Sequence, residues 1–160
     1  MNDRQPTLNL SLRVATDSDF DFCESLSRLN MSAYREARGI TWDRQRFRAS
    51  WREFENLMLL ADGEAVGVLR LLPEGQALAI RDLQLLPGVR GRGIGAWALE
   101  QAKTMARGRG FGRLVLRVYA DNRARQLYLR HGFSVVEMVD ATLHMACLLP
   151  PVEEDCPGAG

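Results

Sequence analysis

A run of glycines and arginines near the middle of the chain has the residue types of an anion-binding site. Three glycines alternate with other residues directly before a segment that has the pattern of a helix. Glycine has no Cβ, so it adopts positive φ values readily and lets a ligand approach the backbone closely. The start of a helix offers unpaired N–H groups and a partial positive charge, which together favour phosphate. The predicted anion site consists of Arg90, Gly91, Arg92, Gly93, Ile94 and Gly95.

The same glycines allow two other interpretations. Residues 91–96, GRGIGA, also fit the dinucleotide-binding fingerprint G-x-G-x-x-G/A. That fingerprint normally lies in the first strand-to-helix turn of its domain, whereas roughly half of this chain comes first. Residues 87–90 also separate the glycines from the preceding strand, where the fingerprint needs a tight turn. A glycine turn with a purely structural role is the second alternative.

A strand and a helix have to hold this turn in place. Residues 77–86 are mostly apolar and predict a buried strand, which Pro87 ends. Behind the glycines, apolar residues recur at helical spacing as far as residue 105, and Gly108 predicts the end of that helix. The turn is therefore expected to lie between a central strand and the helix that follows it.

Hydrophobic periodicity and turn residues predict the remaining elements. Asp62-Gly63 and Asp140-Ala141 are predicted to close hairpins, and Pro73-Glu74-Gly75 to turn the chain into the central strand. Strands are predicted at 9–15, 56–61, 65–72, 113–119, 133–139 and 142–149. Helices are predicted from the cap cluster 16–19 to Met31 or Tyr34, with Gly39 as the helix stop, from 41–43 to 51, and at 123–131. We expect one domain at residues 1–150 and a disordered tail at 151–160.

Composition restricts the classes of function. The chain has 160 residues, of which 46% are hydrophobic and 26% charged, as in an ordinary globular protein. A net charge of +1 is too small to argue for a nucleic-acid partner. The three cysteines are widely spaced, so neither a metal site nor a disulfide framework is predicted. There is no apolar signal core and no membrane-spanning run, and cytoplasmic localisation is the expectation.

The glycine turn resembles motif A of the GNAT (GCN5-related) N-acetyltransferases, R/Q-x-x-G-x-G/A. The matching residues are Arg90 to Gly95, and the strand end Leu83-Gln84-Leu85-Leu86-Pro87 precedes them as it does in the family. In that family, the backbone N–H groups of this turn hold the pyrophosphate of acetyl-CoA. The resemblance therefore implies acetyl-CoA as the cosubstrate.

A second stretch, residues 118–133, resembles motif B of the same family, N-x-x-A-x-x-x-Y-x-x-x-GF. Asn122 and Tyr128 are six residues apart, and Asp121 holds the position seven residues before the tyrosine. Which of Asn122 and Asp121 takes the role of the family's asparagine stays open. The resemblance covers roughly residues 9–149 and implies an α/β fold with a mixed, mostly antiparallel sheet flanked by helices. Only residues 78–86 and 114–119 are expected to be parallel neighbours.

The resemblance implies transfer of an acetyl group from acetyl-CoA to a primary amine by direct attack in a ternary complex. The leaving thiolate needs a proton, and Tyr128, with an ordinary pKa of about 10, is the implied general acid. Asp82 is the implied base, acting through water, with His144 as the second candidate. A surface ion pair of Asp82 with Arg81 or Arg70 is the alternative role for that carboxylate.

The remaining site residues follow from the same resemblance. Leu83, Gln84 and Leu85 are expected to pair with the pantetheine amides as an added strand, and a backbone N–H near Leu85 to meet the thioester carbonyl. Asn122 is expected to contact the pantetheine or the acceptor, and Arg125 the CoA phosphates. The acceptor pocket is expected to include Tyr34, Trp42 and His144.

The sequence does not select among peptide N-termini, lysine side chains, polyamines and small amine metabolites. A non-catalytic module that senses acyl-CoA is the alternative function, although a pure sensor has no need of Tyr128 at the acid position. Self-association as a homodimer is also expected, because edge strands often pair in this family.

Overall fold

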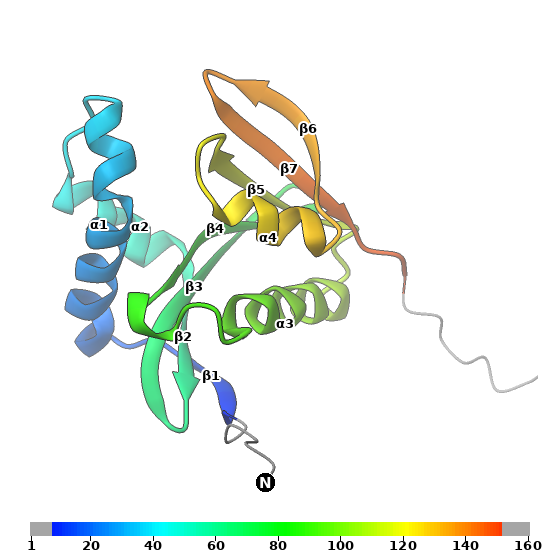
Figure 1. Ribbon diagram of the computed structural model, residues 1–160. Coiled ribbons are helices and arrows are strands. Elements are labelled where there is room, and N and C mark those ends of the chain that lie inside the picture. The colour runs from blue at the N-terminus through cyan, green and yellow to red at the C-terminus, as the bar shows by residue number, and fades with distance from the viewer. Residues whose placement is uncertain (1–7, 152–160) are drawn as a thin grey trace, which may run out of the picture. The chain divides into compact units, whose positions relative to one another are not determined.

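The computed structural model describes residues 8–151 (Figure 1). Seven strands are hydrogen-bonded in the order β1-β2-β3-β4-β5-β7-β6, and helices connect them. The strands are β1 (Leu10–Val14), β2 (Glu55–Ala61), β3 (Glu64–Glu74), β4 (Ala77–Leu85), β5 (Arg113–Tyr119), β6 (Ser134–Val139) and β7 (Thr142–Leu148). The helices are α1 (Phe20–Ala37), α2 (Arg44–Glu53), α3 (Ile94–Gly108) and α4 (Ala124–Arg130), with 3-10 turns η1 (Asp17–Asp19) and η2 (Pro87–Val89). The predicted order of elements is confirmed.

The chain divides into two compact units. The first comprises the residues up to Leu72 together with Arg81–Ala98, and the second comprises Pro73–Ile80 with the chain from Leu99 onward. No helix in residues 8–151 is long and apolar enough to cross a membrane.

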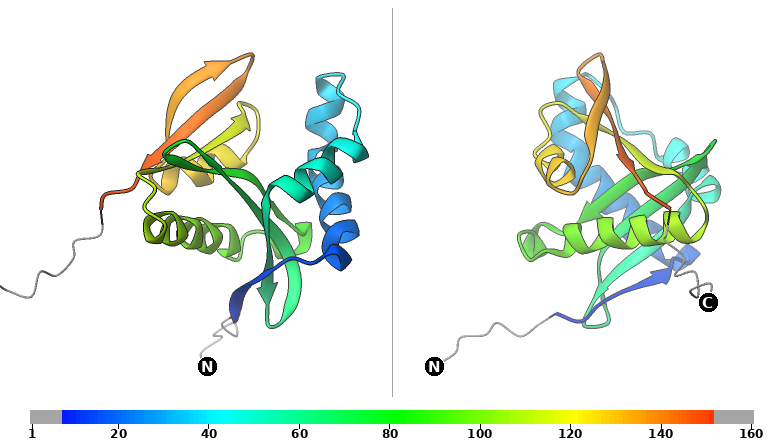
Figure 2. Two further views of the ribbon diagram at one scale, coloured as in Figure 1. Left: turned by 180° about the vertical axis from the view of Figure 1, so that it is seen from behind. Right: turned by 90° about the vertical axis from the view of Figure 1, so that its right-hand side faces the viewer.

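In the first unit, α1 and α2 pack against one face of β2 and β3 (Figure 2). The 3-10 turn η1, which leads directly into α1, begins with a capping box between Thr16 and Asp19, where the sequence predicted a cap cluster. An ion pair from Arg13 lowers the pKa of Asp19 to about 2. The core between these layers joins Phe20, Cys23, Phe47, Trp51, Met58 and Val68.

Two predicted boundaries in this part of the chain are wrong. Helix α1 continues to Ala37 instead of ending at Met31 or Tyr34, because residues 32–37 contain no helix breaker. Gly39, which the sequence predicted as the helix stop, follows with φ of 64°. Strand β3 continues through Pro73 to Glu74, so the predicted turn at Pro73 is displaced toward Gly75, which has φ of 60°.

The second unit contains the parallel strand pair. Residues 77–80 of β4 pair with residues 113–116 of β5 in parallel, which confirms the predicted arrangement. Strand β5 pairs with β7 and β7 with β6, both antiparallel, and Asp140 and Ala141 adopt positive φ values at the predicted hairpin turn. Figure 1 shows α4 beside β5, followed by the β6–β7 hairpin.

Gly67 marks a close approach between β3 and the end of β4. The pairing of β2 and β3 shifts register here, with Leu59 opposite Gly67 and Leu60 opposite Ala65, so that Val66 is an extra residue. The Val66 carbonyl accepts the N–H of Leu86 at 2.9 Å. A Cβ at Gly67 would overlap the Gln84 carbonyl oxygen and lie 2.8 Å from Leu85 Cδ2.

We therefore expect Gly67→Ala to lower the free energy of unfolding by about 1 to 3 kcal/mol, as overpacking does. The overlapping atom belongs to the backbone, so β3 or β4 has to move. Gly108→Ala is the matched control: it lies in α3, a Cβ there meets no atom within 4 Å, and alanine favours a helix. Urea titration of both variants measures the difference, and a parental midpoint for Gly67→Ala would contradict the predicted clash.

Candidate active site

The glycine turn lies in the first unit and opens directly into α3. Gly91 and Gly93 have φ values of 81° and 79°, a region that side chains with a Cβ rarely adopt. The Gly93 carbonyl accepts the N–H of Trp97 at 3.0 Å, so the helical hydrogen bonds begin at Gly93. The N–H groups of the first helical turn therefore have no partner within the helix.

This turn fits a phosphate group. A Cβ built at Gly91 or Gly93 meets no atom within 4 Å, so the space beside both residues is open. Arg90 and Arg92 are exposed on either side of Gly91 and supply positive charge. The turn η2 separates β4 from the glycines, whereas the dinucleotide fingerprint requires the glycines to follow the strand directly. The geometry therefore favours the interpretation as a phosphate-binding turn of the motif A type.

The carboxylate of Asp82, at the end of β4, is engaged by three side chains. Its Oδ2 accepts from Ser27 Oγ at 2.9 Å, and its Oδ1 accepts from Gln84 Nε2 at 2.6 Å. Arg70 Nη1 lies 3.6 Å from Oδ2. The ion pair with Arg70 that the sequence suggested is therefore observed, and the carboxylate is partly buried instead of lying on the surface.

Arg70 is a buried cation that connects several elements of the first unit. Its side chain is 4% exposed, and its guanidinium lies over the rings of Phe47 and Phe54 at 4.3 and 4.8 Å. Nε donates to Asn56 Oδ1 at 2.9 Å and Nη2 to Ser50 Oγ at 2.5 Å. Burial lowers the pKa of Arg70, and the charge of Asp82 opposes that shift.

Two polar residues of α1, Ser27 and Asn30, also contact the end of β4. Asn30 Nδ2 donates to Gln84 Oε1 and to the Leu85 carbonyl, each at 3.0 Å. Neither Ser27 nor Asn30 was predicted from the sequence, whereas Arg70 was suggested as an ion-pair partner of Asp82. The available signal was the position of Ser27 and Asn30 at helical spacing from Cys23, on the face of α1 that the apolar residues bury.

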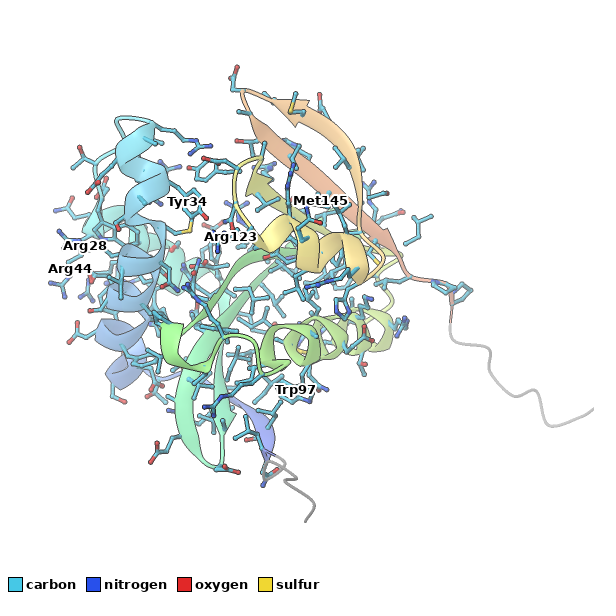
Figure 3. All side chains as sticks on the ribbon, viewed as in Figure 1. Arg28, Tyr34, Arg44, Trp97, Arg123 and Met145 are labelled. Carbon is cyan, nitrogen blue, oxygen red and sulfur yellow. The ribbon has the colours of Figure 1, made fainter. Side chains whose placement is uncertain are left out.

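The predicted acceptor residues of the first unit differ in their surroundings. Trp42 packs on Phe47 with ring centroids 5.5 Å apart, and the Arg35 guanidinium lies 4.8 Å from the Trp42 ring centre. Trp42 Nε1 is buried and has no hydrogen-bond partner in the described chain, so this indole belongs to the edge of the core. Tyr34 is half-buried on α1, on a different side of the helix from Arg28 (Figure 3).

A groove of about 530 Å³ lies on the outward side of α1, where Figure 3 labels Arg28 and Arg44. Its lining comes from α1 and the first residue of α2 and includes none of the predicted site residues. Arg44 pairs there with Asp21 at 3.1 Å, and both side chains are exposed. The groove therefore has no role in the chemistry considered below.

The second unit holds the residues of motif B. Tyr128 is 7% exposed and packs edge-on against Phe133, with ring centroids 5.8 Å apart. Asn122 Oδ1 accepts the N–H of Ala124 at 2.9 Å, so this side chain helps to start α4. Arg125 is exposed on α4.

His144 lies on β7 in the same unit. It is opposite Arg117 of β5 and Glu137 of β6, and its Nδ1 is 4.0 Å from Glu137 Oε2. The described residues contain no group of three or more His, Cys, Asp or Glu side chains placed to hold a metal ion. The ionisable candidates are therefore distributed over both units, with Asp82 in the first and Tyr128 and His144 in the second.

Residues 23–133 match the family model described as the acetyltransferase (GNAT) family. The chain belongs to this family. The match includes both the glycine turn and the Asn122–Phe133 stretch, and the resemblance seen in the sequence is confirmed.

Two curated relatives match part of this chain. A streptothricin acetyltransferase of Streptomyces lavendulae is 39% identical over 77 residues, which are 46% of this chain and 41% of that protein. A mycothiol acetyltransferase of Jonesia denitrificans is 36% identical over 70 residues, 43% of this chain and 22% of that protein. The matched stretches thus span less than half of either relative.

A solved structure shows the same fold over nearly the whole chain. The PaiA N-acetyltransferase of Thermoplasma acidophilum, crystallised with coenzyme A, aligns with a TM-score of 0.71 at 16% identity. The alignment covers 88% of this chain and 99% of that one. The mixed, mostly antiparallel α/β sheet flanked by helices, with one parallel strand pair, is therefore the GNAT fold.

Proposed function

We propose that this chain is an N-acetyltransferase that moves the acetyl group of acetyl-CoA to a primary amine by direct attack in a ternary complex. The observation that carries the proposal is the glycine turn at the start of α3. Gly91 and Gly93 adopt positive φ, and no atom lies within 4 Å of a Cβ built at either position. In a chain of the GNAT family, this turn is where the acetyl-CoA pyrophosphate is expected to bind.

The cosubstrate is proposed to bind along the first unit. The N–H groups at the start of α3 and the exposed arginines Arg90 and Arg92 hold the phosphates. Leu83, Gln84 and Leu85 of β4 pair with the pantetheine through their backbone. In the second unit, Asn122 contacts the pantetheine or the acceptor, and Arg125 the phosphates.

The chemical step forms a bond between the amine nitrogen and the acetyl carbon and breaks the bond between that carbon and sulfur. The Leu85 N–H is the proposed donor to the carbonyl oxygen as charge develops there. Tyr128 gives its proton to the leaving thiolate. The amine's proton leaves through water toward Asp82, with His144 as the alternative acceptor.

The acceptor is proposed to be an amine recognised by Tyr34, Trp42 and His144. A panel test should include streptothricin, because one relative is named for it. Peptides with a free N-terminus, lysine peptides, polyamines and small amine metabolites complete the panel.

Self-association is proposed to use β6, the last strand in the sheet order, along which Val136 and Met138 are 66% and 65% exposed. Light scattering measures this association. Cytoplasmic localisation stays a prediction.

The test is the release of free CoA thiol from acetyl-CoA in the presence of each amine, with mass spectrometry of the acetylated product. An enzyme releases thiol and product in equal amounts, and only with particular amines. A sensor binds acetyl-CoA in calorimetry but releases no thiol above the rate without protein. This second outcome, over the whole panel, would favour the non-catalytic alternative.

A further inference from the structure

The end of β4 is held by a hydrogen-bonded chain of side chains that starts on α1. Asn30 donates from Nδ2 to Gln84 Oε1 and to the Leu85 carbonyl, and Gln84 donates from Nε2 to Asp82. Ser27, one turn before Asn30, donates to the other oxygen of Asp82. All of these residues belong to the first unit.

The acceptors fix the orientation of both amide groups in this chain. Gln84 faces a carboxylate at one end and the donor group of Asn30 at the other, so reversing its amide would place oxygen against oxygen at Asp82. Asn30 faces two carbonyl oxygens, which only its NH₂ group can satisfy. Replacing that NH₂ group by an oxygen therefore has no compensating rearrangement.

The backbone direction shows which edge of β4 Asn30 reaches. The Leu86 N–H donates to Val66 of β3, so it points toward β3. Across a planar trans peptide the preceding carbonyl points the opposite way, so the Leu85 carbonyl points away from β3. In an extended strand, the N–H and C=O of one residue lie on the same edge, so the Leu85 N–H shares that direction.

We propose that Asn30 is a positioning residue for acetyl transfer, which holds the Leu85 backbone through its carbonyl so that the Leu85 N–H meets the thioester carbonyl. The inference rests on the proposed function. Asn30 acts through the Leu85 backbone and does not itself touch the reacting atoms. Tyr34, four residues further along α1, lies on the same side of the helix, so Asn30 also ties the helix of a proposed acceptor residue to the strand that binds the cosubstrate.

The test compares Asn30→Asp and Asn30→Ala with Ser32→Ala. Aspartate keeps the shape of the side chain but offers no donor to Leu85, and alanine removes the contact without adding a charge. Ser32 is exposed on the same helix and donates to the Leu29 carbonyl, so it is the matched control. Ser32→Ala is expected to keep kcat within about twofold of the parent.

We expect kcat to fall by about 30-fold in Asn30→Asp. Deleting an oxyanion donor outright lowers kcat further, by about 100- to 1,000-fold. In Asn30→Ala, kcat is expected to fall by about tenfold, which is less than the loss of about 100-fold that a misplacement of about 1 Å can cause. The Kd for CoA, which lacks the acetyl carbonyl, is expected to stay within about threefold of the parent in both variants. A merely structural role would instead weaken CoA binding and lower Tm in step with kcat.

Parental kcat in Asn30→Ala, or loss of CoA affinity in proportion to loss of rate, would overturn the inference. If Asn30→Asp does not fold, Asn30→Ala alone decides. Failure of the proposed function is a separate result, because the parent would then release no thiol with any amine. A normal rate both in the parent and in Asn30→Ala would contradict only the role of Asn30.

Discussion

Replacing Tyr128 by phenylalanine is expected to lower the turnover number for acetyl transfer by about 100-fold while the protein folds and binds acetyl-CoA normally. General acid catalysis is typically worth about 100- to 10,000-fold in rate, and the substitution removes the hydroxyl that is proposed to supply the proton. The ring itself is retained. It is 7% exposed and packs edge-on against Phe133, so its packing is unchanged in the variant.

The stability of Tyr128→Phe is expected to change by at most about 1 to 2 kcal/mol, the scale of one hydrogen bond. The N–H groups of His131 and Phe133 both donate to the backbone carbonyl of Tyr128, and these hydrogen bonds do not involve the hydroxyl. The end of α4 is therefore preserved. Circular dichroism and calorimetry with acetyl-CoA establish that any loss of rate comes from the chemical step.

Tyr119→Phe is the matched control for this experiment. The chain has three tyrosines, and Tyr119, on β5, is the one to which no role in the reaction is assigned. Its variant is expected to keep parental turnover. A phenol acts as an acid only while it is protonated, so the parent rate is expected to fall at alkaline pH and Tyr128→Phe to lack that fall. Near-parental turnover in Tyr128→Phe would remove Tyr128 from the mechanism and leave water, or a donor near Asn122, to supply the proton.

The order of the elements was predictable because each depends on residues close together in the sequence. Asp62-Gly63 and Asp140-Ala141 both contain residues with positive φ in the structure, as the hairpins required. The glycine turn was predictable for the same reason, since Gly91 and Gly93 adopt the conformation that their lack of a Cβ allows. The predicted end of α1, at Met31 or Tyr34, was too early. No helix breaker occurs before Gly39, and helix propensity alone marks no boundary in residues 32–37.

The partners of the site residues, apart from the suggested pair of Asp82 with Arg70, were not predictable from the sequence in the same way. Asp82 accepts hydrogen bonds from Ser27 on α1 and Gln84 on β4, and it lies beside Arg70 on β3. These contacts depend on how α1 packs on the strands, which no short motif encodes. Trp42 is similar, since its place beside a loop did not indicate that its ring packs against Phe47.

Placing an aspartate at Gly93 is expected to weaken acetyl-CoA binding by at least about 100-fold. Two unit charges about 4 Å apart repel by about 4 kcal/mol at an effective dielectric constant of about 20, which corresponds to about 1,000-fold in Kd. Screening by salt at this exposed turn reduces that figure. The protein is expected to fold, because a Cβ at Gly93 meets no atom within 4 Å and aspartate tolerates positive φ better than most residues.

Gly93→Asn and Gly75→Asp separate charge from conformation in this experiment. Asparagine has the shape of aspartate and the same strain at φ of 79°, so it is expected to weaken binding by less than about tenfold. Gly75 has φ of 60° and no atom within 4 Å of a built Cβ, and it lies in the β3–β4 turn, so Gly75→Asp carries the same charge without touching the proposed site. The affinity of the Gly75→Asp variant for acetyl-CoA is expected to match that of the parent.

Calorimetry at low and high salt completes the argument for the glycine turn. If a phosphate lies beside Gly93, the difference between the aspartate and asparagine variants is expected to shrink as salt increases, because screening weakens the repulsion. If both variants weaken acetyl-CoA binding equally at every salt concentration, the loss of affinity comes from the shape of the new side chain and not from its charge. Unchanged affinity in Gly93→Asp would refute the turn as the phosphate site, and tight NADH binding without CoA binding would support the dinucleotide alternative.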